Sequence, residues 1–229
     1  MTGSLKVHSA STEIEAFLAE AGTALARADR GRLIFALDAT LSRQPTWDLA
    51  QSLQTRMFEA AAGTSGLDVQ LMYFRGQGEC RASRFVSQGA GLADLMSRIE
   101  VRGGTTQWRR VLAHARDEAK NARVGALVMV GDAMEENADT LCGLAGELAL
   151  LNVKAFAFHE GDDARAGATF REIARLTGGA YGRFDAGAAA RLAGLLRAAA
   201  AYAAGGRGAL EALAAREPEA RPLLAQMRP

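Results

Sequence analysis

Three short segments of the sequence carry oxygen-bearing side chains within or next to apolar runs. They are Asp38-Ala39-Thr40-Leu41-Ser42, Gly103-Gly104-Thr105-Thr106 and Gly131-Asp132. Together they offer two carboxylates and several hydroxyls. Hard divalent cations, above all Mg²⁺, prefer octahedral oxygen ligands and keep part of their water. The residue types therefore favour a site for Mg²⁺ (or Mn²⁺).

The spacing within these segments lets the side chains converge. Asp38, Thr40 and Ser42 stand at alternate positions, so they meet if the loop curls around an ion. The glycine pair lets the backbone near Thr105 approach closely, because glycine has no side chain to obstruct it. The expected metal-site residues are Asp38, Thr40, Ser42, Thr105 and Asp132. Thr106 is expected to cap the following helix. The alternative is that all of these residues form ordinary polar turns and helix caps.

Strands and helices alternate along the chain in a way that would bring these segments together. Amphipathic repeats predict helices, and short apolar runs predict strands at 33–37, 69–74, 126–130, 153–158 and 180–184. A return strand at 80–86 follows a glycine-containing turn. We therefore expect an α/β, Rossmann-like three-layer sandwich: a mostly parallel six-stranded sheet with one antiparallel edge strand and helices on both faces. In such sheets the functional loops lie beyond the carboxyl ends of the strands.

The two ends of the chain are assigned to separate segments. Residues 31–204 form the predicted domain, and residues 1–30 are interpreted as an N-terminal helical extension packed on it. Gly205-Gly206 interrupts the last helix. Residues 205–229 are polar and proline-bearing, and we expect them to form a C-terminal tail, since chain ends are disordered by default.

The charge balance disfavours several kinds of partner. The 229 residues include 27 Lys and Arg against 26 Asp and Glu, a net charge of +1, which gives no broad basic field for nucleic acid or an acidic membrane. No apolar run approaches the roughly 20 residues that span a bilayer. We do not expect the N-terminus to be a secretory signal, and Cys80 and Cys142 are too few for a disulfide framework. We expect a cytoplasmic protein with no nucleic-acid, membrane or small-molecule partner.

In this order the motifs D-x-T-x-S, G-G-T and G-D resemble the metal-ion-dependent adhesion site of von Willebrand factor A (VWA) domains. The resemblance covers roughly residues 31–204. Thr40 stands where the family usually has serine, and Ala133 stands where it usually has glycine. The chain resembles the uncharacterised single-domain VWA proteins of bacteria more than the large extracellular adhesion receptors.

The resemblance implies a function for the site. Thr40, Ser42 and Thr105 would bind the ion through hydroxyls, directly or through water, and Asp38 and Asp132 mostly through water. An ion with few directly bonded carboxylates keeps an exchangeable water, which a partner's Glu or Asp can replace. The chain is thus expected to be a protein-interaction module in which Mg²⁺ (or Mn²⁺) bridges to a protein partner, and not an enzyme.

Three residues near the motifs are candidates for a partner-facing rim: Trp47, Trp108 and Glu135. Tryptophan is enriched among the residues that dominate the binding energy of interfaces. The alternative for both tryptophans is packing of helix against sheet, because large aromatic side chains are mostly buried. The alternative for Glu135 is a solvated acidic loop.

Other classes of function compete with this interpretation. A haloacid-dehalogenase-like Mg²⁺-dependent phosphatase would use Asp38 as its phosphoryl-accepting nucleophile. The pattern of that family at this point is D-x-D, whereas this chain has Asp38-Ala39-Thr40, and Thr40 cannot serve as the second acid. The domain could also be a metal-silent scaffold of the same fold. A nucleotide-binding domain is disfavoured, because no G-x-G-x-x-G follows the first strand.

Overall fold

The computed structural model describes residues 30–43, 66–87, 89–185 and 189–227. The chain divides into two compact units, Met1–Arg30 and Gly31–Pro229. Apart from Arg30, the first unit lies outside the described residues, and so does the predicted N-terminal extension. The second unit contains the whole sheet.

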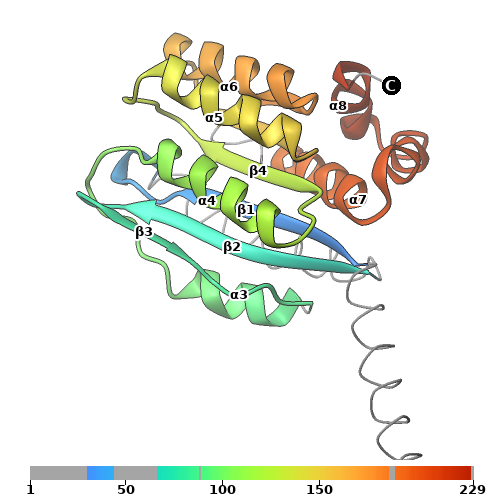
Figure 1. The fold of residues 1–229 in the computed structure, drawn as a ribbon, viewed down its shortest axis with the longest axis horizontal. Helices are drawn as coiled ribbons and strands as arrows, with labels where there is room; N and C mark the ends of the chain where they lie inside the picture. The colour runs from blue at the N-terminus through green and yellow to red at the C-terminus, as the bar shows by residue number, and fades with distance from the viewer. Residues whose placement is uncertain (1–29, 44–65, 88, 186–188, 228–229) are drawn as a thin grey trace, which may run out of the picture. The chain divides into compact units, whose positions relative to one another are not determined.

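A six-stranded sheet forms the centre of the second unit, as predicted (Figure 1). Its strands are β1 (Gly31–Asp38), β2 (Leu67–Arg75), β3 (Glu79–Ala82), β4 (Ala126–Gly131), β5 (Lys154–Glu160) and β6 (Ala180–Phe184). They lie in the order β3-β2-β1-β4-β5-β6. Only the pairing of β2 with β3 at one edge is antiparallel among these strands. The hairpin follows from the turn at Gly76 and Gly78, whose positive φ angles suit glycine.

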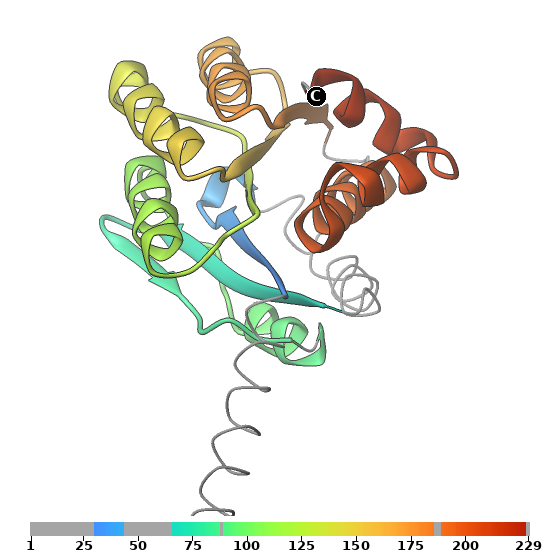
Figure 2. The ribbon, with the colours of Figure 1, turned by 45° about the vertical axis from the view of Figure 1, so that its right-hand side comes forward.

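Helices cover both faces of the sheet (Figure 2). One face carries α3 (Gly89–Ser97) and α7 (Ala189–Ala214). The other carries α4 (Trp108–Asn121), α5 (Ala138–Leu150) and α6 (Ala164–Thr177). Helices of both layers connect successive strands along the chain, because two neighbouring parallel strands need a crossover connection between them.

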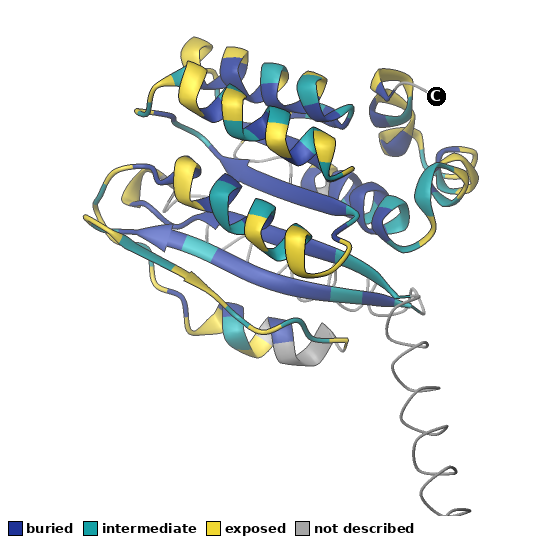
Figure 3. Cartoon of the chain, in the orientation of Figure 1, coloured by how far each residue is buried: buried dark blue, intermediate teal, exposed yellow. Residues whose placement is uncertain are grey.

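Each central strand contributes side chains to two separate cores. Leu33, Phe35 and Leu37 of β1 pack with the α3–α7 layer, whereas Ile34 and Ala36 pack with the α4–α6 layer. This division follows from the two-residue period of a strand. Figure 3 shows the consequence: the central strands are buried, and exposed residues gather on the outer sides of the helices. Continuous apolar runs are therefore what a parallel sheet with two covered faces requires.

The C-terminal segment differs from its prediction. Gly205 and Gly206 do interrupt α7 with non-helical backbone angles. The described residues that follow are not a tail: η2 (Pro218–Ala220) and α8 (Arg221–Gln226) are ordered elements, and Leu223 is fully buried in the core. The predicted boundary at 205 was wrong because a few well-spaced apolar residues are enough to dock a polar segment on an existing core.

The side chain of Gln226 explains part of this docking. Its amide donates to the carbonyl of Tyr181 and accepts from the backbone N–H of Tyr181, both at 2.9 Å. Tyr181 belongs to β6, the edge strand farthest from β3. The side chain thus takes the place of a neighbouring strand, and α8 covers an edge that would otherwise offer unpaired backbone groups.

Candidate metal centre

The first and third predicted segments lie at the carboxyl ends of two adjacent parallel strands. Asp38 is the last residue of β1, and Asp132 directly follows β4. The two strands pair directly, with Leu37 opposite Val130. From β1 the chain proceeds to one side of the sheet and from β4 to the other, so this is the point where the strand order reverses. Such a switch point is where open α/β sheets bind ligands.

The loop after β1 curls as the alternate spacing predicts. Asp38 is completely buried, and its Oδ1 accepts the backbone N–H of Thr40 at 2.8 Å. The hydroxyls of Thr40 and Ser42 lie 3.0 Å apart. The loop then enters the short 3₁₀ helix η1 (Leu41–Arg43). The structure therefore brings the oxygens of Asp38, Thr40 and Ser42 into one loop.

The glycine-containing segment lies against this loop. The backbone N–H of Arg102 donates to the carbonyl of Ala39 at 3.0 Å. A Cβ on Gly104 would overlap the carbonyl of Gly76 in the β2–β3 turn. Only glycine permits this approach of two backbones. Thr105, which follows Gly104, is exposed. It belongs to the same segment as Arg102, whose hydrogen bond to Ala39 joins that segment to the loop after β1.

Trp108 fixes the position of the third segment from inside the protein. Its indole is fully buried, and its N–H donates to the carbonyl of Ala133 at 3.0 Å. The ring packs edge-on against Phe74 and Phe170, with centroids 4.8 and 5.2 Å away. A Cβ on Gly131 would overlap this ring. The prediction of Trp108 as part of a partner-facing rim was therefore wrong, and the packing alternative is correct; Trp47 lies outside the described residues.

Two glutamates of the loop after β4 hold the start of α4. The N–H of Thr106 donates to Oε2 of Glu135 at 2.6 Å, and the hydroxyl of Thr106 donates to Oε2 of Glu136 at 2.7 Å. The N–H of Glu135 donates back to the hydroxyl of Thr106 at 3.1 Å. Oε1 of Glu136 accepts the N–H of Arg109 at 2.9 Å. We call Thr106, Glu135 and Glu136 the glutamate clasp.

The clasp corrects the predicted role of Thr106. The N-cap of α4 is Gln107, and the N–H of Arg109 in the first turn of the helix donates to a carboxylate from another loop, that of Glu136. Negative charge is also favourable at this end of a helix. Glu135 is exposed as a residue, yet its carboxylate is engaged within the chain. The sequence signal was the Glu135-Glu136 pair after the G-D motif, whose contact partner lies about 30 positions away and could not be read from spacing.

Asp132 carries a buried polar atom that a ligand could satisfy. Its Oδ1 is buried and accepts no hydrogen bond from the described part of the chain. A buried carboxylate oxygen without a donor is costly, and a bound cation removes that cost. Oxygen ligands from two carboxylates and three hydroxyls also match the preference of Mg²⁺ or Mn²⁺. No cluster of three His, Cys, Asp or Glu suited to a metal occurs among the described residues, so the predicted ion depends on hydroxyls.

A buried histidine supports the backbone of Asp132. His159 Nε2 lies 3.3 Å from the carbonyl oxygen of Asp132, and Nδ1 lies 3.0 Å from the hydroxyl of Tyr181. Because a carbonyl only accepts, the neutral ring carries its proton on Nε2 and accepts the tyrosine hydroxyl at Nδ1. Burial lowers the pKa of His159, which favours this neutral form. Spacing alone did not indicate this contact.

Comparisons with known proteins agree with the architecture. The chain is similar to a von Willebrand factor type A protein from Catenulispora acidiphila (19% identity, TM-score 0.61), over 76% of this chain and 42% of that one. It is also similar to the vWF domain of the type V pili tip protein Mfa5 from Porphyromonas gingivalis (9% identity, TM-score 0.61, 75% and 94% covered). A third similar structure is the SpRpn10 VWA domain (15% identity, TM-score 0.53, 71% and 95% covered). No family model and no curated protein matches the sequence.

The fold and the position of the site define a class: a three-layer α/β domain with polar loops at the switch point of its sheet. More specifically, the chain has the VWA fold. The match to the Catenulispora protein spans less than half of that protein's length. None of the described helices has the length and apolar character needed to cross a membrane.

Proposed function

We propose that this chain is a divalent-metal-binding protein-interaction module, in which a bound Mg²⁺ (or Mn²⁺) bridges to an acidic residue of a protein partner. The observation that carries the proposal is the buried Oδ1 of Asp132, which has no hydrogen-bond donor among the described residues. Asp132 directly follows β4, which pairs with β1, and β1 ends at Asp38. Two carboxylates at one sheet edge, with hydroxyls near them, favour a cation there.

Five residues would hold the ion: Asp38, Thr40, Ser42, Thr105 and Asp132. Three of them contribute neutral hydroxyls, and the two carboxylates would act mostly through water, so the ion would have few directly bonded anionic ligands. When bound, the ion would supply a coordination position that attracts a carboxylate. Ser42 and Thr105 are exposed, so this position would be open to a partner while Asp38 anchors the loop from the interior.

Two of the similar structures support an interaction role. One is the pili tip protein Mfa5, and another is the pilus adhesin SpaC from Lactobacillus rhamnosus GG (9% identity, TM-score 0.56). Thr40 occupies the position where a phosphatase of the rival class would need an acid. Cys80 and Cys142 are both free, which is consistent with the reducing cytoplasm as the expected location.

The metal is tested by calorimetric titration of the purified chain with Mn²⁺. We expect Asp38→Ala and Asp132→Ala to lower the affinity by about 10- to 100-fold. Asp162→Ala is the matched control, because Asp162 is an exposed carboxylate that follows β5 at the same edge of the sheet. Unchanged binding in both site variants would refute the assignment of the ion to these loops.

The bridging role is tested by capture of partners from the source cell's lysate, with Mg²⁺ and with EDTA in parallel. A protein retained only with Mg²⁺, and lost with Asp132→Ala, is the expected result. Retention that is indifferent to EDTA would contradict bridging and would indicate a scaffold that works through another surface.

A further inference from the structure

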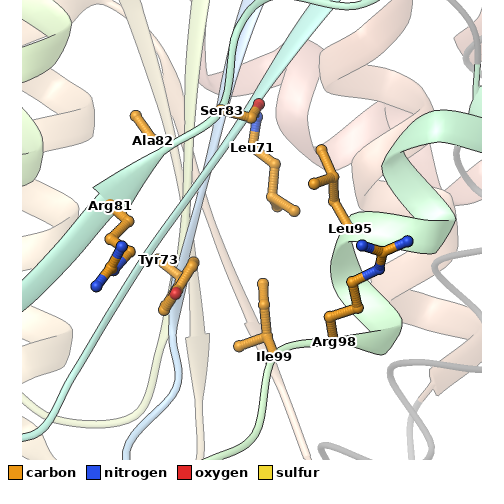
Figure 4. Close-up of a pocket in the computed structure, with 8 residues that line it drawn as sticks. All are labelled: Leu71, Tyr73, Arg81, Ala82, Ser83, Leu95, Arg98 and Ile99. Atoms are coloured by element: carbon orange, nitrogen blue, oxygen red, sulfur yellow. The ribbon is translucent and has the colours of Figure 1, made fainter.

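A second surface feature lies at the edge of the sheet, away from the five predicted metal-site residues. It is a pocket of about 250 Å³ between the β2–β3 hairpin and α3 (Figure 4). Its apolar lining consists of Leu71, Tyr73, Ala82, Leu95 and Ile99. Leu71 and Ile99 are almost completely buried and form its floor, whereas Ala82 is exposed. We call this feature the hairpin pocket.

Two arginines flank the apolar residues of the hairpin pocket. Arg81 of β3 and Arg98, which directly follows α3, lie on opposite sides of it in Figure 4, and each side chain is 71% exposed. Their ion-pair partners, Glu79 and Asp94, do not belong to the described residues that line the pocket. The lining therefore combines an apolar floor with two cations and no anion.

Both arginines have N–H donors left for a second carboxylate. Arg81 contacts Glu79 through Nε, and Arg98 contacts Asp94 through Nη2. A guanidinium has five N–H donors, so other donors of each group are available for a second carboxylate. A ligand that suits this pocket has an apolar group between two negative charges.

We propose that the hairpin pocket binds a large apolar side chain, of the size of Phe or Leu, from a partner protein segment with acidic residues on both sides of it. The size of the pocket favours a side chain over a free ligand, because small-molecule sites commonly measure about 300–1,000 Å³. Buried aromatic anchors dominate many interfaces. This inference goes beyond the proposed metal bridge and uses none of its residues.

The test is a nuclear magnetic resonance titration of the full chain with a synthetic peptide, acetyl-Gly-Glu-Phe-Glu-Gly-amide. We expect shifts at the amides of Leu71, Leu95 and Ile99 that are the same in Mg²⁺ and in EDTA. The peptide with Gln in place of both Glu residues is expected to bind more weakly. Each exposed ion pair contributes about 1.4- to 5-fold in affinity.

Three variants locate the binding. Arg81→Gln and Arg98→Gln are each expected to weaken it by up to about fivefold. The matched control is Arg175→Gln, because Arg175 is also exposed and paired with a helix neighbour, Glu172. Leu95→Ala removes a half-buried apolar side chain from the lining of the pocket, and it is expected to reduce the shifts.

Several results would overturn the inference. Shifts confined to the loops of Asp38 and Asp132, or lost in EDTA, would show that the peptide binds at the metal centre. Equal binding of the Glu and Gln peptides would remove the role of the arginines. Tighter binding of hexanoate than of the peptide would make the occupant a small amphiphile. An absence of shifts at millimolar peptide would show that the pocket does not bind such segments.

Discussion

Replacing Asp132 by alanine should change stability in opposite directions without and with metal. In the metal-free chain the buried Oδ1 of Asp132 accepts no hydrogen bond from the described residues. Burying such a group costs about 1–3 kcal/mol. Because the residue Asp132 as a whole is only half-buried, we take the lower end of this range of free energies, about 1 kcal/mol. Asp132→Ala should therefore raise the metal-free unfolding free energy by about 1 kcal/mol, or the melting temperature by about 2–4 °C.

Metal should reverse this order. A ligand at one hundred times its Kd stabilises the folded state by about 2.7 kcal/mol, which corresponds to about 5–11 °C for a chain of this size. The original chain should gain this increase in Mn²⁺, whereas Asp132→Ala should gain little. The original chain thus becomes the more stable of the two once the ion is bound.

The assay is thermal unfolding followed by circular dichroism, in EDTA and across a Mn²⁺ series, for the original chain, Asp132→Ala and the control Asp162→Ala. The control should follow the original chain in both conditions. The reasoning is refuted if Asp132→Ala lowers the melting temperature in EDTA and keeps the full Mn²⁺ response, because the carboxylate would then be a structural group that the fold satisfies by itself.

Three further predictions concern the clasp, the hairpin and catalysis. Thr106→Val removes the hydroxyl that joins Glu135 and Glu136, so the unfolding free energy in urea should fall by about 1–3 kcal/mol, and a loss as small as that of the exposed Thr140→Val would contradict the clasp. The Arg75 guanidinium beside Glu79 lowers the pKa of that carboxyl from 4.5 to about 2; since the depressed pKa stabilises the fold above 4.5, this stability should be lost as pH falls towards 2, and acid titration of Glu79→Gln should show a smaller loss in that window. Generic phosphomonoesters should not be turned over, and Mg²⁺-dependent release of phosphate that disappears in Asp38→Asn would instead favour the phosphatase class.

The strands and much of the candidate site could be predicted from the sequence because their signals are local. An apolar run such as 33–37 or 126–130 indicates a strand covered on both faces, and the structure confirms both strands. Gly178 ends α6 in the left-handed conformation that glycine adopts readily, with φ of 66°. The alternate polar positions after β1 predicted a loop that curls, and the hydroxyls of Thr40 and Ser42 do meet.

The remaining features depend on which distant segments pack together, and only the tertiary structure decides that. By its type Trp108 could belong to an interface or to a core, and the structure places it in the core, packed against Phe74 and Phe170. Thr106 meets its glutamates across about 30 positions, and Gln226 pairs with a strand 45 positions away. Residue types and their periodicity determined the elements and the oxygens available to a metal, whereas packing determined which polar groups found partners within the chain and which, like Oδ1 of Asp132, were left for a ligand.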